Sequence, residues 1–154
     1  MVTELTVREA VGEDLPAIVS MGKKFLASGP YKDQISSPDN AMSLALAVLK
    51  NVNGHIFVAD DGTGPKTGPK GVFAFIVFPH YFSGELTAAE LIWYVEPEYR
   101  QGGVALKLLA AAEKYAKDLG AVRMQLTAPT EELGKLYKYC GGYAKVEVGY
   151  QRRL

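Results

Sequence analysis

The sequence predicts a single mixed α/β domain, and three observations support that fold class. Short runs rich in β-branched and aromatic residues, typical of strands, alternate with stretches whose apolar residues recur every three or four positions, as in helices. Hydrophobic residues make up 48% of the 154 residues, enough for one sizeable core. No linker divides the chain, so residues 1–154 are predicted to form one domain.

The first part of the chain is predicted to form a strand and two helices. Residues 5–9 alternate weakly between apolar and polar side chains, which favours a strand. Residues 15–26 place their apolar side chains on one helical face, and Gly29-Pro30 should end that helix. Ser37-Pro38 has the pattern of an N-cap followed by proline in the first turn, which predicts the start of a second helix.

Three strands are expected next. Residues 55–59 and 72–78 are rich in β-branched and aromatic side chains. Between them the tetrapeptide Thr-Gly-Pro-Lys occurs twice in succession, at 63–70, which indicates a lengthened hairpin loop. Residues 90–95 form another apolar run that ends at Glu96-Pro97.

A helix over 104–119, ended by Gly120, should follow. The rest of the chain predicts a strand at 122–127, a short helix at 130–139 and a final strand at 146–153. The predicted order is therefore strand, two helices, three strands, helix, strand, helix, strand.

Charge and cysteine content exclude several classes of function. Seventeen basic and seventeen acidic residues cancel, so no overall field favours nucleic acid or an anionic membrane, and neither is an expected partner. Cys140 is the only cysteine, which rules out an intrachain disulfide and favours a reducing compartment. Residues 1–8 are charged where a signal peptide needs an apolar stretch, and no apolar run approaches the roughly 20 residues that span a bilayer. A cytoplasmic location is expected.

A glycine-containing segment between a predicted strand and a predicted helix, Arg100-Gln101-Gly102-Gly103-Val104-Ala105, is suited to binding phosphate. Backbone N–H groups and the helix dipole converge at such a turn, and glycine allows close approach. An ordinary glycine turn explains these features equally well. The spacing does not fit the dinucleotide pattern G-x-G-x-x-G, and no Gly-Lys-Ser or Gly-Lys-Thr triplet marks a P-loop.

These residues resemble the GNAT superfamily of N-acetyltransferases, whose pattern is Arg or Gln, two residues, Gly, one residue, then Gly or Ala. Arg100, Gly103 and Ala105 match that pattern. Residues 93–100 look like the family's fourth strand and its exit, residues 2–26 like its first strand and helix, and Leu136-Tyr137 like its late helix. The resemblance covers nearly the whole chain. Its details are also similar to acetyltransferase-like proteins of tailed phages.

The sequence departs from the family pattern at three places. Gln101 stands where the family usually has glycine, so Gly102 would have to supply the flexibility. Thr130 replaces an asparagine at the start of the late helix, where it can still act as a cap. An extra residue in Gly141-Gly142-Tyr143 suggests a bulge or a shifted strand.

The resemblance implies a mostly antiparallel mixed sheet whose fourth and fifth strands splay apart, flanked by about four helices. It also implies acetyl-CoA as co-substrate, its pantetheine arm in the gap between those strands, and no metal. The implied cofactor-binding residues are Trp93, Val95, Arg100, Gln101, Gly102, Gly103, Val104, Ala105 and Thr130.

Direct transfer of the acetyl group to an amine needs a base and an acid. Glu90, near the splay point, is the first choice for the base, although a plain surface carboxylate is an equally good interpretation; Glu85 and His80 are further candidates. Tyr137 matches the family's general acid and could also be a core residue.

The acceptor is left open between a small-molecule amine and a protein or peptide amine, with a homodimer as one possible assembly. Tyr31, Tyr81 and Tyr94 are the predicted acceptor contacts. Four glutamates could form a local acidic mouth: Glu85, Glu90, Glu96 and Glu98. One alternative function is an acyl-CoA-binding module without turnover, acting as a sensor or scaffold. Another is a structural or interaction protein that has lost the cofactor.

Overall fold

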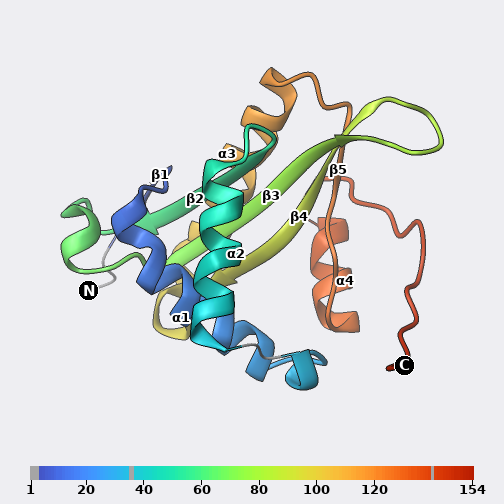
Figure 1. The fold of residues 1–154 in the computed structure, drawn as a ribbon. Coiled ribbons are helices and arrows are strands. Elements are labelled where there is room, and N and C mark those ends of the chain that lie inside the picture. Colours follow the sequence, from blue (N-terminus) through green and yellow to red (C-terminus); the bar gives the residue numbers. More distant parts are fainter. Residues whose placement is uncertain (1–3, 35–36, 140) are drawn as a thin grey trace.

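The computed structural model describes residues 4–34, 37–139 and 141–154, so Cys140 lies outside the described residues. A twisted five-stranded sheet runs through the middle of the molecule, with helices on both of its faces (Figure 1). No helix within those ranges is long and apolar enough to cross a lipid bilayer.

The sheet has the strand order β1-β2-β3-β4-β5. Its strands are β1 (Thr6–Glu9), β2 (Gly54–Asp60), β3 (Gly71–Pro79), β4 (Leu86–Val95) and β5 (Arg123–Gln125). The first four strands pair antiparallel, and β5 pairs parallel to β4. This is the mixed, mostly antiparallel sheet that the resemblance implied, although β4 begins four residues before the predicted strand.

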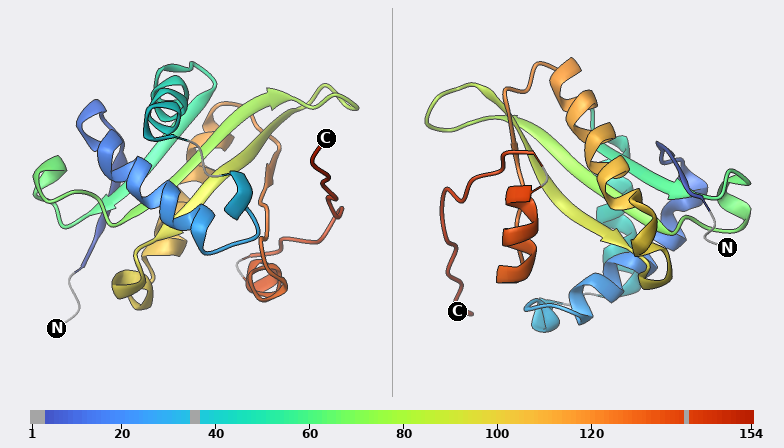
Figure 2. Two further views of the ribbon diagram at one scale, coloured as in Figure 1. Left: turned by 60° about the horizontal axis from the view of Figure 1, so that its bottom comes forward. Right: turned by 180° about the vertical axis from the view of Figure 1, so that it is seen from behind.

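Helices α1 (Leu15–Ala27) and α2 (Pro38–Lys50) cover one face of the sheet, and α3 (Val104–Asp118) covers the other (Figure 2). Each face has its own apolar cluster. Ile18 and Met21 pack on Val58 and Val72 beneath α1, whereas the larger cluster beneath α3 includes three phenylalanines of β2 and β3. The short α4 (Glu131–Tyr139) lies beside β5 at the end of the sheet (Figure 1).

The predicted helix boundaries agree with the local contacts. The Ser37 side chain accepts a hydrogen bond from the Asn40 N–H and caps α2. Gly120, at φ +95°, follows the end of α3, a backbone conformation that favours glycine. Thr130 Oγ1 accepts from the Leu133 N–H at 3.3 Å, as expected of the cap of α4.

The predicted final strand is wrong, because residues 146–153 pair with no strand among the residues that the structure describes. Gly141 and Gly142 both have left-handed φ values, +99° and +90°, and the chain then runs beside α4 rather than along the edge of β5 (Figure 1). Apolar side chains in this segment, such as Val146 and Tyr150, stay exposed. The strand predicted at 122–127 is also shorter, since β5 spans only three residues.

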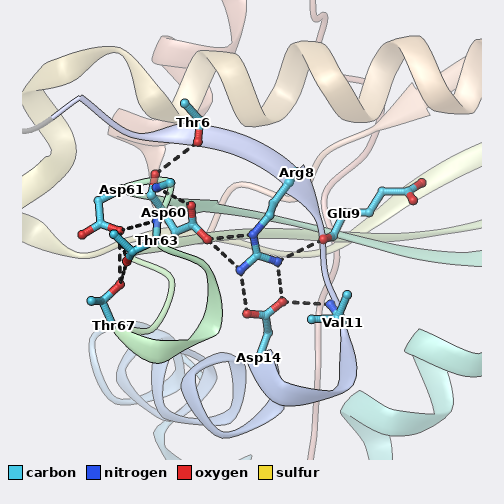
Figure 3. Close-up of polar contacts among 10 residues, drawn as sticks. Thr6, Arg8, Glu9, Val11, Asp14, Asp60, Asp61, Thr63 and Thr67 are labelled. Atoms are coloured by element: carbon cyan, nitrogen blue, oxygen red, sulfur yellow. Dashed lines mark hydrogen bonds and ion pairs between the residues drawn. The ribbon is translucent and has the colours of Figure 1, made fainter.

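A buried ion network fixes β1 to the start of α1 and the end of β2 (Figure 3). The Arg8 guanidinium donates to both oxygens of Asp14, at 2.7 and 2.9 Å, and to Asp60 at 2.7 Å. Both carboxylates are fully buried. Burial alone would raise the pKa of Asp14, but hydrogen bonds from Arg8 and the Val11 N–H outweigh it and leave the pKa below its usual value.

Replacing Arg8 with lysine should destabilise the protein by about 1–2 kcal/mol, because an ammonium cannot match the forked hydrogen bonds to two carboxylates. Urea unfolding at neutral pH measures this loss. Because the folded pKa of Asp14 is depressed, its stabilisation is present above its usual pKa range and is lost as the pH falls through the folded value. Equal stability of Arg8→Lys and wild type would contradict this assignment.

Candidate functional site

Strands β4 and β5 are paired over only three residues and then separate. Residues 87–89 of β4 pair with residues 123–125 of β5, and within the described ranges no pairing of these two strands continues beyond them. At the same level β4 contains a bulge: Phe75 of β3 pairs with Glu90 and Ala74 with Ile92, so Leu91 has no partner on β3. The expected splay of the fourth and fifth strands is therefore present, and it begins at Glu90.

The Glu90 carboxylate bridges the two strands where they separate. Its Oε2 accepts a hydrogen bond from the Thr127 N–H at 2.9 Å. Burial raises the pKa of Glu90 to about 7, although the bond from Thr127 opposes that rise. A carboxyl group with this pKa exchanges a proton readily near neutral pH, as a general base must.

Tyr137 lies at the same opening, on α4. Its hydroxyl donates to the Thr127 carbonyl at 3.0 Å, so Thr127 contacts Glu90 through its N–H and Tyr137 through its C=O. The Tyr137 ring stacks on the Trp93 ring with centroids 5.5 Å apart. The two residues predicted as base and acid are thus held by one residue of the chain that follows β5.

The predicted pyrophosphate loop leaves the far end of β4. A 3₁₀ turn, Pro97–Gly102, is followed by Gly103 at φ +72° and then by α3. The left-handed glycine is therefore Gly103, whereas Gly102 ends the 3₁₀ turn and Gln101 is exposed. The N–H groups of the first turn of α3 have no partner within the helix, and no side chain in the described part of the chain caps them.

The Arg100 side chain is bound to the end of β4. Its Nε donates to the Val95 carbonyl at 2.8 Å, and its guanidinium lies 5.3 Å from the centre of the Tyr94 ring. These contacts of Arg100 hold the C-terminal end of β4 and the turn after it in place.

The residues around the splay fit a coenzyme A group. A Cβ built on Gly103 meets no atom within 4 Å, so open space lies beside the uncapped start of α3. The Trp93 Nε1 is buried and has no hydrogen-bond partner among the residues that the structure describes, so this donor is available beside Tyr137. The start of α3 suits phosphate oxygens. The Trp93 N–H suits an amide or thioester carbonyl.

A hollow of about 250 Å³ opens beside Glu90, between the C-terminal end of α1 and the separated strands. Four apolar side chains line it: Phe25, Leu26, Leu91 and Pro129. The other lining residues are Tyr31, Gln34, Glu90 and Thr127. The Tyr31 ring stacks on Phe25 with centroids 5.8 Å apart, which places this predicted acceptor contact in the wall of the hollow.

The structure does not bring the other two predicted acceptor tyrosines to this hollow. Tyr94 is buried under Arg100 in the α1 cluster. Tyr81 stacks on His80 in the β3–β4 hairpin, and 77% of its surface is exposed. Neither residue lines the hollow, so both contribute to other parts of the molecule.

The acidic mouth proposed from the sequence does not form. Glu85 pairs with Arg123 at 3.0 Å, at the start of β4, whereas Glu96 pairs with Lys24 at 2.7 Å beyond its end. Glu98 lies on the 3₁₀ turn after β4. Glu90 is the one carboxylate among the residues that line the hollow.

Sequence patterns missed three residues that shape this site: Thr127, Gln34 and Leu91. Thr127 acts through its backbone groups, which no side-chain pattern reveals. Gln34 lies on a short 3₁₀ turn, Lys32–Gln34, which has no hydrophobic period. Leu91 looks like any apolar strand residue until the pairing with β3 shows the bulge.

Comparison with known proteins supports the fold and the family. No curated protein sequence is significantly similar to the chain. Among solved structures, a transcriptional regulator from Bacillus halodurans C-125 is 21% identical and has a TM-score of 0.80; the alignment covers 98% of this chain and all of that one. The aminoglycoside 6'-N-acetyltransferase AAC(6')-Ih from Acinetobacter baumannii is 14% identical, with a TM-score of 0.77 and coverage of 98% and 99%.

A third solved structure, AAC(6')-Iy in complex with the bisubstrate analogue CoA-S-monomethyl-acetylneamine, is 19% identical with a TM-score of 0.78, covering 98% of this chain and 99% of that one. At such identities these likenesses show the fold alone. The model of the acetyltransferase (GNAT) family matches residues 24–141, well over half of the sequence. The chain belongs to the GNAT family of acetyltransferases.

Proposed function

We propose that the protein transfers an acetyl group from acetyl-CoA directly to a primary amine of a small molecule, through a ternary complex. The observation that carries this proposal is the meeting of Glu90, Thr127 and Tyr137 where β4 and β5 separate. One end of this opening faces a hollow that can hold an amine, and the other leads along β4 to the uncapped start of α3.

Bound acetyl-CoA would supply an activated thioester carbonyl. The N–H groups at residues 101–105 and the start of α3 would bind the pyrophosphate, with Gly103 leaving room for it. Backbone groups near Trp93 and Val95, on the edge of β4 that β5 leaves open, would hold the pantetheine arm as a strand would. Thr130, which caps α4, is the remaining predicted contact.

Glu90 would remove a proton from the acceptor amine. A lysine-like amine has a pKa of about 10.4, so forming its neutral state near pH 7 costs roughly 4.6 kcal/mol. The pKa of about 7 keeps a large fraction of Glu90 ionised at neutral pH, while burial keeps the carboxylate basic enough to accept a proton. The bond from the Thr127 N–H fixes its direction.

Tyr137 would donate a proton to the departing thiolate. Its phenol oxygen is held 3.0 Å from the Thr127 carbonyl and its ring is fixed against Trp93. The hydroxyl hydrogen can rotate about the C–O bond, from that carbonyl towards a sulfur in the opening. A phenol with a pKa near 10 is well matched to a thiolate of similar basicity.

Replacing Tyr137 with phenylalanine tests this role. Turnover should fall about tenfold, because the acid is lost while the ring stack is kept, and the affinity for acetyl-CoA should stay the same. Free-thiol release measures turnover and calorimetry measures affinity. Tyr139→Phe is the matched control, since Tyr139 lies on the same helix and is 87% exposed. Unchanged turnover in Tyr137→Phe would remove this residue from the mechanism.

A binding module without turnover is the second candidate, because the cofactor loop and its glycine need neither Glu90 nor Tyr137. Both candidates predict that acetyl-CoA stabilises the fold, by about 2.7 kcal/mol at 100 times its dissociation constant. They differ in thiol release when an amine is added, which only the enzyme produces. A lack of any thermal shift with acetyl-CoA would contradict both.

A further inference from the structure

The hollow beside Glu90 has both apolar and polar walls, and four of its eight lining residues are apolar. Phe25, Leu26, Leu91 and Pro129 form its apolar walls, and the stacked Tyr31 ring extends the aromatic surface of Phe25. Its volume of about 250 Å³ lies below the range of roughly 300–1,000 Å³ usual for sites that take drug-sized ligands. The hollow therefore suits a small molecule with an apolar or aromatic body.

Only one carboxylate, Glu90, lies among the lining residues, so one ammonium group at most finds an opposite charge there. The elements around the hollow add no excess of negative charge. The 3₁₀ turn beside it contains both Lys32 and Asp33, and α4 contains two glutamates and two lysines. Two of the other glutamates near β4, Glu85 and Glu96, are already paired with Arg123 and Lys24.

The C-terminal segment contacts the wall of the hollow. Gln34, in the wall of the hollow, donates to the Gln151 side chain at 3.3 Å. Arg152 and Arg153 follow Gln151 directly, and both are exposed. The two arginines next to this contact therefore offer no negative charge to a molecule that carries several ammonium groups.

We infer that the acceptor is a small monoamine whose primary amino group is carried on an apolar or aromatic body, and that the site rejects polycationic amines such as polyamines and aminoglycosides. This inference rests on the proposed acetyl transfer and names the acceptor class for it. The ammonium group would lie at Glu90 and the apolar body against Phe25, Tyr31 and Leu91. It assigns this chain a different acceptor from those named for the aminoglycoside acetyltransferases that share its fold.

The test compares 2-phenylethylamine with spermidine, using the full chain and acetyl-CoA at about pH 8, where Glu90 is mostly ionised. The expected kcat/KM is at least about tenfold higher for 2-phenylethylamine, because spermidine places additional ammonium groups against apolar walls. Equal or higher kcat/KM with spermidine overturns the inference and leaves acetyl transfer standing.

Variants at Leu91 make the comparison independent of the amines' intrinsic reactivity. Leu91 is 45% exposed at the bulge, so a polar side chain there is tolerated. Leu91→Asp should raise the ratio of spermidine to 2-phenylethylamine kcat/KM about tenfold relative to its neutral isostere Leu91→Asn. Leu44→Asp, on the exposed side of α2, should leave the ratio unchanged. Identical ratios in the two Leu91 variants overturn the inference.

The proposed acetyl transfer and the proposed acceptor class can be refuted separately. If acetyl-CoA raises the melting temperature but neither amine is acetylated, the proposed acetyl transfer is wrong. The acceptor class is then decided by calorimetric binding of the same two amines to the complex with coenzyme A. Tighter binding of 2-phenylethylamine supports the inference, and equal or tighter binding of spermidine overturns it.

Discussion

Replacing Glu90 with glutamine is expected to lower kcat/KM about 100-fold while leaving the affinity for acetyl-CoA unchanged. Loss of a positioned general base typically costs a factor of this size or more. Glutamine has the same shape, and its side-chain oxygen can still accept from the Thr127 N–H, so the splay should keep its geometry. Steady-state kinetics with 2-phenylethylamine and calorimetry with acetyl-CoA measure the two quantities.

The pH dependence of kcat/KM tests whether Glu90 is the titrating group. Because the ionised form is the base, kcat/KM should rise with pH and bend near 7 in the wild type, and the bend should vanish in Glu90→Gln. The Thr127 N–H donates to this carboxyl group, and the other polar side chains in the wall of the same hollow are Tyr31 and Gln34. An unchanged bend in Glu90→Gln would assign it to another residue.

The same raised pKa has a consequence for stability. Glu90 binds its proton more tightly in the folded state, with a pKa of about 7 against 4.5 for an ordinary glutamate. Its contribution to folding is therefore complete below about 4.5 and is lost as the pH rises through 7. Urea unfolding should show Glu90→Gln gaining stability relative to the wild type between those pH values. A constant difference would contradict the burial of this carboxyl group.

Replacing Gly103 with alanine should weaken acetyl-CoA binding by about tenfold or more. At φ +72° a side chain is strained, which costs about 1–2 kcal/mol of folding free energy. The protein itself leaves room for the methyl group, since no atom lies within 4 Å of a Cβ built there. Lost affinity would therefore come from the space and the N–H directions that the pyrophosphate needs.

Gly84 provides a closely matched control for that substitution. It has φ +73°, and a Cβ there also meets no atom within 4 Å, but it lies in the β3–β4 hairpin away from α3. Gly84→Ala should lose a similar amount of stability and keep full affinity for acetyl-CoA. If both variants bind acetyl-CoA equally well, the cofactor does not lie at Gly103.

The sequence predicted those parts of the fold that depend on local patterns. The caps at Ser37 and Thr130 and the end of α3 before Gly120 are decided by residues within one helical turn, and all three are present. The strand predicted at 146–153 alternates as a strand should, yet alternation cannot show whether a neighbouring edge is within reach. Two left-handed glycines, at 141 and 142, direct that segment elsewhere.

Within the site, patterns predicted side-chain types better than their partners. The place of Glu90 on the fourth strand predicts it as the base. Its carboxylate accepts from the Thr127 N–H, a contact that depends on a bulge in β4. Only the pairing of β4 with β3 reveals this bulge. Arg100 is predicted from the family pattern to contact the cofactor. Its Nε donates to the Val95 carbonyl, a contact that the pattern does not predict, because it depends on how tightly the turn after β4 closes.

The most direct test of the central claim is mass spectrometry of the acceptor after incubation with acetyl-CoA and the protein, together with assay of the released thiol. Acetyl transfer predicts that 2-phenylethylamine gains one acetyl group for each thiol released, and that both signals fall together in Glu90→Gln. Binding of acetyl-CoA with no acetylated amine, or equal product with wild type and Glu90→Gln, would contradict it.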